Sequence, residues 1–400
     1  MRAAFLAAAL VLGACGPRAP KGSVAVTLDP GDRGFLFDGP SRRVLFVRGT
    51  YPEKTYAGFA DLETGRANLH RSPVRALVSV GSARPNSKRA LFIAKPIVDE
   101  NAGERPQGGI LLDTIPGNAA SDRALQMTRS LEPRCVLETA WSAGALVISS
   151  RVEGPAYLGR WRDGSEALDP IMNLPPGIAA CTASARLPRL GVVLEARTGA
   201  SFKVWDVDQK KEISTVALPE YPSIVGRAED GRLFATWRSE TSQESVLGSL
   251  DPETGRMTGL YASSDTIVSA VAVPSGVAVL LRDDREVDSK AAHLKPQKVV
   301  VVGPGRETLV SRAWTRLPSS LVGYDAATNR FILAVVDTEY AAVWAVPQDE
   351  PGFNAAAAQV ERATNPFRRR IKPALGILFS AFFLLTLLIG LYNASSGSTS

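Results

Sequence analysis

Histidine and cysteine are scarce in this sequence, with 2 and 3 copies among 400 residues, and aromatic residues make up only 7%. The isolated His70 and His293 exclude a histidine-rich metal centre, because neither has cysteines or carboxylates beside it at metal-ligand spacing. The sequence also lacks a phosphate-binding loop with its lysine, a Gly-x-Ser-x-Gly elbow and a His-Glu-x-x-His motif. We therefore predict no metal, no cofactor and no catalytic residue.

A clustered basic face is absent as well. The chain carries 46 basic and 40 acidic side chains, but Arg2, Arg368 to Arg370 and Lys372 lie at its two ends. Removing these five leaves 46 − 5 = 41 basic residues against 40 acidic ones. Nucleic-acid binding needs basic residues gathered on one face, so a near-neutral body argues against such a partner.

The N-terminus is typical of an export signal. One arginine is followed by a run of twelve apolar and small residues, which at ~1.5 Å per residue is too short for a ~30 Å hydrocarbon core. Leu12-Gly13-Ala14-Cys15 resembles the lipobox of bacterial lipoproteins. The resemblance implies that residues 1–14 are a signal peptide and that Cys15 is diacylated, with 15–21 as a linker. A plain secretory peptide is the alternative.

The C-terminus carries the longest apolar segment. Residues 374–392 contain no charge, follow a basic linker at 364–373 and precede a polar tail at 393–400. This length and composition predict one transmembrane helix, with a buried core helix as the alternative. Gly376 and Ser380 form a small-x-x-x-small pair that can seat another helix.

The two ends disagree about orientation. The lipobox places the body outside the cytoplasm, whereas the basic cluster on the body side of the C-terminal segment is typical of a cytoplasmic flank. We expect the earlier export signal to decide. The body is then periplasmic or extracytoplasmic, attached to the inner or only cell membrane by the acyl chain and the helix. A tail-anchored protein with a cytoplasmic body is the alternative.

Between the ends, one pattern recurs: a turn, an apolar run, a polar loop, a second apolar run and another turn. The apolar runs have 4–8 residues rich in β-branched and aromatic types, and their starts are 41 to 55 residues apart. Such runs are typical of strands, and such a period is typical of four-stranded propeller blades. The clearest runs occupy residues 43–48, 89–95, 145–151, 191–197, 232–238, 277–282 and 330–337.

These repeats predict an all-β fold, a seven-bladed β-propeller over residues 22–363. Closing the ring removes exposed sheet edges, and residues 22–28 are suited to be the N-terminal closing strand of the last blade. Ser41–Val47 and the hairpin Asp61–Gly65 resemble the blades of TolB-like and WD-repeat propellers, and Trp205-Asp206 is a Trp-Asp pair of the WD type. The resemblance implies a fold and no particular activity.

Cys135 and Cys181 lie 46 residues apart, close to one blade period. Both precede the second strand of their blade by about ten residues, so the pattern puts them on the innermost strands of adjacent blades. Export permits their oxidation to a disulfide. Two buried free thiols are the alternative interpretation.

Six of the seven predicted second strands end in a basic residue. A ring of this kind can bind an anionic ligand or the acidic surface of a partner, or each cation can pair with an acid of a neighbouring blade. The longest loops after these strands are 96–108 and 283–297, where contacts with partners are most expected. The series consists of Arg48, Lys95, Arg151, Arg197, Arg238 and Arg282.

The leading hypothesis is a non-catalytic, membrane-tethered scaffold that binds other envelope or integral membrane proteins. The first alternative is an envelope glycan hydrolase or lyase that uses carboxylates on the loop side. Buried carboxylates with raised pKa values would favour the enzyme, and acids paired to the basic ring would not. A ligand-binding sensor is the second alternative.

Overall fold

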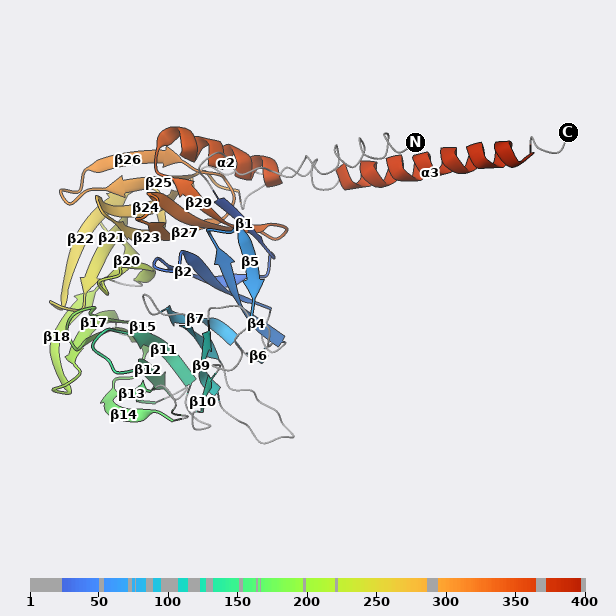
Figure 1. The fold of residues 1–400 in the computed structure, drawn as a ribbon. Helices are drawn as coiled ribbons and strands as arrows, with labels where there is room; N and C mark the ends of the chain where they lie inside the picture. The colour runs from blue at the N-terminus through green and yellow to red at the C-terminus, as the bar shows by residue number, and fades with distance from the viewer. Residues whose placement is uncertain are drawn as a thin grey trace.

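The computed structural model of the chain describes residues 24–49, 54–70, 74–75, 77–83, 89–94, 107–113, 123–126, 132–150, 154–162, 165, 167–196, 199–219, 222–285, 294–364 and 372–396. Within these residues the body consists of antiparallel sheets arranged around a common centre (Figure 1). The first strands of successive sheets contact one another, as β2 does with β7 and β19 with β23. This radial arrangement is a β-propeller.

Six of the sheets are built from strands that follow one another in the sequence. The first three contain β2 (Arg33–Asp38), β3 (Arg43–Arg48), β4 (Lys54–Asp61), β5 (Arg66–Leu69) and β6 (Val74–Arg75); β7 (Leu77–Ala83), β8 (Arg89–Ala94), β9 (Gln107–Asp113) and β10 (Arg123–Gln126); and β11 (Glu132–Glu138), β12 (Ala145–Ser150), β13 (Ala156–Trp161) and β14 (Asp169–Leu174).

The following three have the same order. They contain β15 (Ile178–Ala183), β16 (Arg189–Ala196), β17 (Gly199–Asp206) and β18 (Lys211–Leu218); β19 (Ser223–Arg227), β20 (Leu233–Arg238), β21 (Ser245–Asp251) and β22 (Arg256–Ser263); and β23 (Thr266–Val273), β24 (Gly276–Arg282), β25 (Gln297–Val302) and β26 (Thr308–Ala313).

The two ends of the chain share the remaining sheet. Its strands are β27 (Ser319–Asp325), β28 (Arg330–Val336), β29 (Ala341–Pro347) and β1 (Val24–Leu28), and β1 pairs with β29 from Val24↔Ala345 to Leu28↔Ala341. The N-terminal closing strand that the sequence predicted is therefore confirmed. Val26 is fully buried in this position, so the pairing also completes the core.

The prediction of a seven-bladed propeller needs correction. Among the described residues, six sheets have the four-stranded pattern, whereas the sheet of β2 to β5 contains β6 as a fifth strand. The reason is the length of β4. Its C-terminal half pairs with β5 from Gly58↔Leu69 to Asp61↔Arg66, and its N-terminal end extends beyond β5. The backbone groups left free at Lys54 and Thr55 pair with β6 instead.

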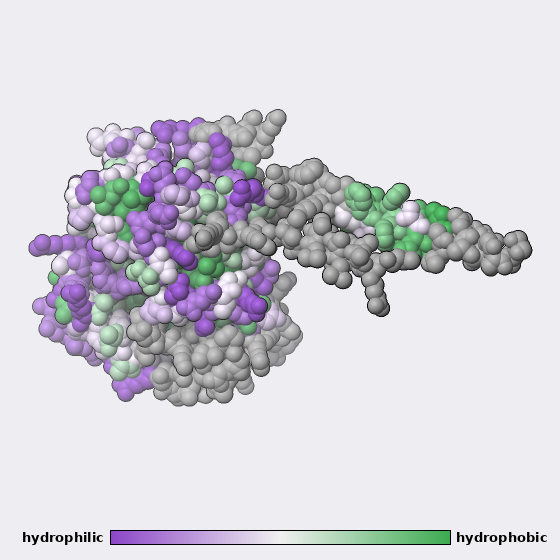
Figure 2. Space-filling model, turned by 45° about the horizontal axis from the view of Figure 1, so that its top comes forward, coloured by the Kyte–Doolittle hydropathy of each residue, from purple (hydrophilic) through white to green (hydrophobic). Residues whose placement is uncertain are grey.

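The prediction of a transmembrane helix over residues 374–392 is also wrong. Helix α3 (Lys372–Ser396) lies there, but among the described residues no helix has the length and apolar character needed to cross a membrane. The exposed apolar side chains of α3 include Ile377, Phe382 and Ile389. Figure 2 shows these apolar side chains exposed along α3.

Helix α2 (Glu350–Thr364) covers part of the propeller. It contacts β26 and β29 and buries Phe353, Ala356 and Val360. The ring of Phe353 lies 5.1 Å from that of Trp314 and 6.2 Å, edge-on, from that of Phe331, which are favourable aromatic geometries. The C-terminal extension of the propeller thus becomes part of its hydrophobic core.

The hairpin turns repeat the chemistry expected from their sequences. The carboxylate of Asp61 accepts hydrogen bonds from the backbone N–H of Glu63 (2.9 Å) and Thr64 (3.0 Å), and Gly65 follows with φ of 69°. Asp251 accepts a bond from the N–H of Glu253 at 2.7 Å, and Gly255 has φ of 66°. Glycine occupies these left-handed positions without steric cost, so both hairpins are set locally.

Candidate functional site: the loop face of the propeller

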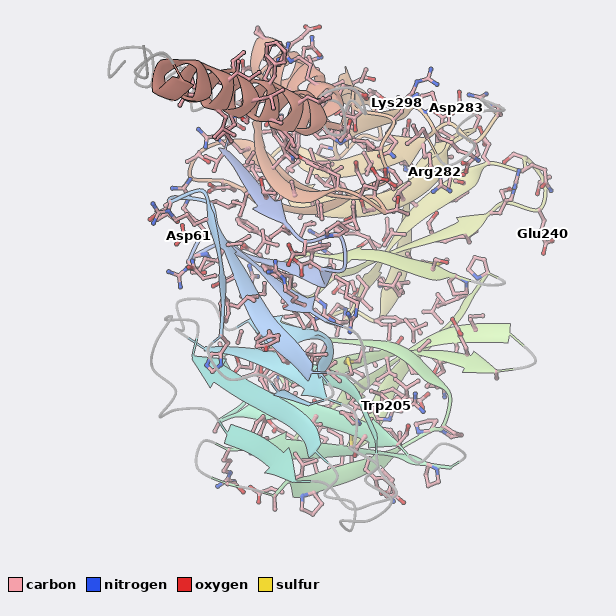
Figure 3. The ribbon with its side chains drawn as sticks, turned by 90° about the vertical axis from the view of Figure 1, so that its right-hand side faces the viewer. Asp61, Trp205, Glu240, Arg282, Asp283 and Lys298 are labelled. Carbon is pink, nitrogen blue, oxygen red and sulfur yellow. A yellow bond between two sulfur atoms is a disulfide. The ribbon has the colours of Figure 1, made fainter. Side chains whose placement is uncertain are left out.

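The loops after the second strands gather at one end of the propeller, which we call the loop face. The opposite end, with the Asp61–Gly65 and Asp251–Gly255 hairpins, is the turn face. Figure 3 shows Arg282, Asp283 and Lys298 close to one another and on the opposite side of the molecule from Asp61. The predicted basic series belongs to the loop face, so its geometry decides what this face can bind.

Arg48 is fully engaged within its own blade. Its guanidinium donates two hydrogen bonds to Asp32, Nε at 2.8 Å and Nη2 at 2.7 Å, and Nη1 lies 2.7 Å from a carboxylate oxygen of Asp29. The bond to Asp32 raises the pKa of Arg48 above its usual value. Asp32 is only 2% exposed, so this bidentate pair fixes the loop that leads from β1 into β2.

Arg238 is also used internally. Its Nε donates a hydrogen bond at 3.1 Å to the backbone carbonyl of Gln243, which closes the loop between β20 and β21. Lys95, Arg151 and Arg197 lie outside the described residues. The described members of the series therefore act in loop closure and ion pairing, and they do not form a ring of unpaired cations.

Arg282 belongs to the densest group of charges on the loop face, which we call the blade-six cluster. Its members come from the connection before β23, from strands β24 and β25 and from the loop after β24. It comprises Asp265, Arg282, Asp283, Asp284, Arg285, Lys295 and Lys298.

Asp284 is the first centre of the cluster. It accepts hydrogen bonds from Arg282 Nε (2.8 Å) and Nη2 (3.2 Å), from Lys295 Nζ (2.8 Å) and from the hydroxyl of Thr266. Partial burial by itself raises the pKa of Asp284, but these donors outweigh it and hold the pKa well below its usual range. Asp284 is therefore a permanently ionised anchor for two cations.

Asp265 is the second centre. Its side chain is 7% exposed and accepts Arg285 Nη2 and Lys298 Nζ, each at 2.8 Å, while Arg285 Nε also contacts Asp283 at 3.0 Å. The side chains of Arg285 and Lys298 are 66% and 43% exposed. Asp265 thus lies beneath the two cations that it binds. The seven side chains sum to 4 − 3 = +1, so the cluster presents preorganised positive charge to solvent.

The carboxylate with a raised pKa lies elsewhere. Burial raises the pKa of Asp38, against the opposing effects of a hydrogen bond from Ser41 and the charge of Arg43. Asp38 ends β2 on the turn face, away from the blade-six cluster. The loop-face acids of that cluster are thus paired to cations, which is the arrangement that disfavours acid–base catalysis there.

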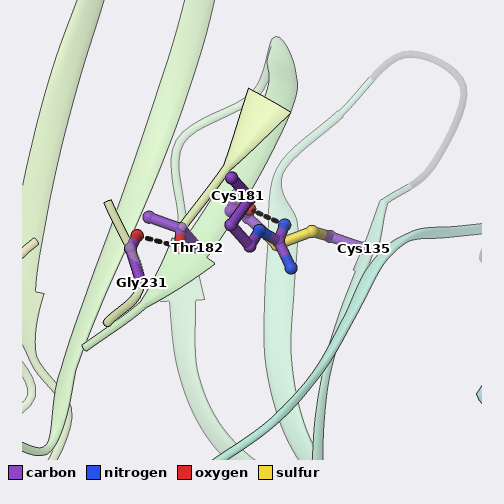
Figure 4. Close-up of a disulfide and its surroundings, with 5 residues drawn as sticks. Cys135, Cys181, Thr182 and Gly231 are labelled. Carbon is purple, nitrogen blue, oxygen red and sulfur yellow. Dashed lines mark hydrogen bonds between the residues drawn. A yellow bond between two sulfur atoms is a disulfide. The ribbon is translucent and has the colours of Figure 1, made fainter. Parts of the chain in front are cut away.

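Cys135 and Cys181 form a disulfide that joins β11 to β15, with their Cα atoms 6.2 Å apart (Figure 4). Of the two interpretations left open by the sequence, the structure has the bonded one. Both cysteines lie on first strands of adjacent sheets, as their spacing predicted. The bond therefore links neighbouring blades near the centre of the propeller.

The remaining predicted site residues have simpler surroundings. Cys15 and His293 lie outside the described residues. His70 is buried, and its backbone N–H donates to Ala57 at 2.8 Å. Gly376 lies on α3 with no described atom within 4 Å of where a Cβ would stand, and Ser380 is exposed, so the structure shows no packing partner for this pair.

Several residues of the site were missed at the sequence level. Asp265, Arg285, Lys295 and Lys298 complete the blade-six cluster, yet they lie at irregular distances from the strand ends that defined the basic series. The many charged residues between positions 282 and 298 could have indicated a charged cluster. The ion pairs of Arg285 and Lys298 with Asp265 could not be predicted from them, because Asp265 lies in the preceding β22–β23 connection.

No known protein family matches this sequence, and no curated protein matches it either. Solved structures do resemble it. An oligogalacturonate lyase in complex with manganese has a TM-score of 0.56 at 12% identity, over 83% of this chain and 92% of the other. An oligogalacturonate lyase from Vibrio parahaemolyticus has a TM-score of 0.52 at 9% identity, over 82% and 92%. A chain of the mitotic checkpoint complex has 0.52 at 9%, over 81% and 91%.

At such identities these likenesses concern the fold alone. The part of the chain that the structure describes contains no group of three or more His, Cys, Asp or Glu side chains that could hold a metal ion. The resemblance to TolB-like and WD-repeat lipoproteins stays a prediction.

Proposed function

We propose that this chain is a non-catalytic interaction module of a bacterial cell envelope, whose loop face binds an acidic surface of a partner protein. The observation that carries the proposal is the construction of the blade-six cluster. The three acids of the cluster hold its four cations in fixed positions, which lowers the entropic cost of binding an anionic partner. No loop-face acid of the cluster is left to act as a general acid.

We also propose that the propeller lies outside the cytoplasm, attached by an acyl chain at Cys15. Two independent observations support this. The lipobox Leu12–Cys15 predicts export, and the Cys135–Cys181 disulfide is of the kind that persists in oxidising compartments. The proposed partners are other envelope or integral membrane proteins on that side of the membrane.

Crosslinking mass spectrometry on native membranes tests both parts. We expect an acylated Cys15 at the mature N-terminus, and crosslinks from Lys295 and Lys298 to acidic segments of one partner. The double variant Arg285→Glu and Lys298→Glu is expected to abolish the crosslinks from Lys295, while Lys298→Glu removes its own reactive amine. The matched double variant Arg66→Glu and Arg256→Glu makes the same change of four charge units on the turn face and should keep the crosslinks from both lysines.

Different outcomes separate the alternatives. An unprocessed Met1 would contradict export and favour a cytoplasmic body. A processed protein that forms no crosslinks, in the wild type as in the variants, would contradict the scaffold and bring the glycan-acting enzyme forward. Crosslinks that survive the double charge reversal would move the interface away from the blade-six cluster.

A further inference from the structure

Arg227 lies at the turn-face end of a first strand, and the first strands of the sheets surround the centre of the propeller. It is the last residue of β19, and its Nη2 donates a 2.6 Å hydrogen bond to the backbone carbonyl of Cys181 on β15 (Figure 4). Cys181 is in turn bonded to Cys135 on β11. Three successive first strands thus meet at this point, and the guanidinium group is held in place by a covalently fixed carbonyl.

The charge of Arg227 is not compensated. Arg42, Arg48 and Arg282 each pair with a carboxylate, but Arg227 has no ion pair with any residue that the structure describes. Its side chain remains accessible to solvent, yet protein atoms surround it closely enough that burial lowers its pKa to about 10. A cation that is accessible to solvent and has no counter-charge in the protein can bind an anion from solution.

The carboxylate of the same hairpin does not supply this counter-charge. Glu229 follows in the turn after β19, and its Oε1 lies 3.4 Å from where a Cβ on Gly39 would stand. Gly39 belongs to the turn between β2 and β3, in a sheet that is not adjacent to that of β19. Glu229 therefore reaches across the ring toward another blade and makes no ion pair with Arg227.

We propose that Arg227 binds a small oxyanion, phosphate or the carboxylate of a small organic acid, at the centre of the propeller. The guanidinium has five N–H donors, and the contact with Cys181 uses one of its nitrogens. The remaining donors form a planar fork that matches two oxygens of such an anion. Because the carbonyl of Cys181 already fixes the group, little side-chain freedom is lost when the anion binds.

Isothermal titration of the full-length processed protein with sodium phosphate and with sodium succinate, at constant ionic strength, tests this proposal. We expect one site per chain for at least one anion, and the anion that binds identifies the ligand class. The variant Arg227→Gln is expected to lose at least about tenfold in affinity, since a charge-assisted pair is removed. The matched variant Arg256→Gln removes an exposed arginine of the turn face and should stay within about twofold of the wild type.

Equal affinity of the wild type and Arg227→Gln would overturn the proposal, as would no binding of either anion to the wild type. Thermal unfolding and the intact disulfide serve as folding checks. If Arg227→Gln does not fold, Arg227→Lys replaces it, because an ammonium group keeps the charge and lacks the fork. A loss of about tenfold then supports the site, and unchanged affinity excludes it. These results are independent of the crosslinking test of the blade-six cluster.

Discussion

Arg42 and Asp325 illustrate how single side chains close this ring. Arg42 Nε lies 2.9 Å from a carboxylate oxygen of Asp325, and the two residues are 283 positions apart in the sequence. Asp325 is almost fully buried and also accepts hydrogen bonds from the N–H of Ala327 (3.1 Å) and the hydroxyl of Thr328 (2.6 Å). The pair joins the turn after β2 to the turn after β27.

We expect Arg42→Ala to destabilise the fold by about 2 kcal/mol, because it leaves a buried carboxylate without its cation. Arg42 also contacts Glu63, whose side chain is 64% exposed. Glu63→Ala is the matched control and should cost less than about 0.5 kcal/mol. Urea denaturation measures both. An equal loss of unfolding free energy in the two variants would show that the burial of Asp325 does not strengthen its ion pair with Arg42.

Asp284 and Asp38 predict opposite responses to pH. The pKa of Asp284 is lowered in the folded state, so its contribution to stability is complete above the unfolded pKa near 3.8 and is lost as the pH falls further. The pKa of Asp38 is raised by burial in the folded state. The folded state therefore loses stability as the pH rises from the unfolded pKa near 3.8 through the higher folded pKa.

Chemical denaturation of Asp284→Asn and Asp38→Asn between pH 3 and pH 6 tests this difference. Relative to the wild type, Asp284→Asn should be least stable at pH 6, and its deficit should shrink toward pH 3. Asp38→Asn should become more stable relative to the wild type over the same rise in pH. Deficits that do not change with pH would contradict the electrostatic interpretation of both sites.

At the scale of elements, the contacts between neighbouring sheets differ in kind. The sheets of β11 and β15 are joined by a disulfide, and Trp141 Nε1 also donates to the carbonyl of Ser184 at 2.8 Å. The sheets of β23 and β27 are joined by the N–H of Leu321, which donates to Ser269 Oγ at 2.7 Å. The covalent contact is thus an addition to interfaces that hydrogen bonds and packing already hold.

Removal of the Cys135–Cys181 bond should therefore weaken the protein without abolishing its fold. For a bridge that spans 46 residues, we expect a loss of about 2–4 kcal/mol in the double variant Cys135→Ser and Cys181→Ser. Thermal unfolding with and without a reducing agent measures this. The wild type should lose stability on reduction and the double variant should not respond. If the reducing agent lowered the unfolding temperature of the wild type and of the double variant equally, the Cys135–Cys181 bond would not be the cause of that change.

At the scale of the whole molecule, the N-terminal strand decides whether the ring closes. β1 pairs with β29 over five residues, and Val26 and Leu28 are buried against the last sheet. Complete burial of such side chains is worth roughly 1.5–3 kcal/mol each. Without β1, the edge of β29 is exposed and the sheet that joins the two ends of the chain is incomplete.

We expect a chain that begins at residue 29 to aggregate or to unfold at a much lower temperature than one that begins at residue 23. Size-exclusion chromatography and thermal unfolding measure the difference. A synthetic peptide of residues 23–29 should restore stability in trans, and the same peptide with Val26→Lys should not. A chain from residue 29 that is as stable as the longer one would show that closure by β1 is dispensable.

Much of the fold was predictable because it depends on neighbours in the chain. Apolar runs such as 145–150 coincide with central strands, and Asp61–Gly65 and Asp251–Gly255 form their hairpins through their own carboxylates and glycines. The strand that closes the ring was predictable as well, since only an unpaired apolar run at the N-terminus could complete the last sheet. The fifth strand β6 was not, because two residues carry no periodic signal.

The site depended on the tertiary structure. Sequence spacing predicted Arg48, Arg238 and Arg282 as members of one series. The ion pairs of Arg48 with Asp32 and of Arg282 with Asp284 could be assigned only from the distances between their side chains in the folded chain. The bond between Cys135 and Cys181, the isolation of Arg227 and the burial of Asp265 likewise arise from how the sheets pack around their centre. Local order along the chain determines strands and turns, whereas the strength and partners of charges depend on solvent exclusion and on contacts between distant segments.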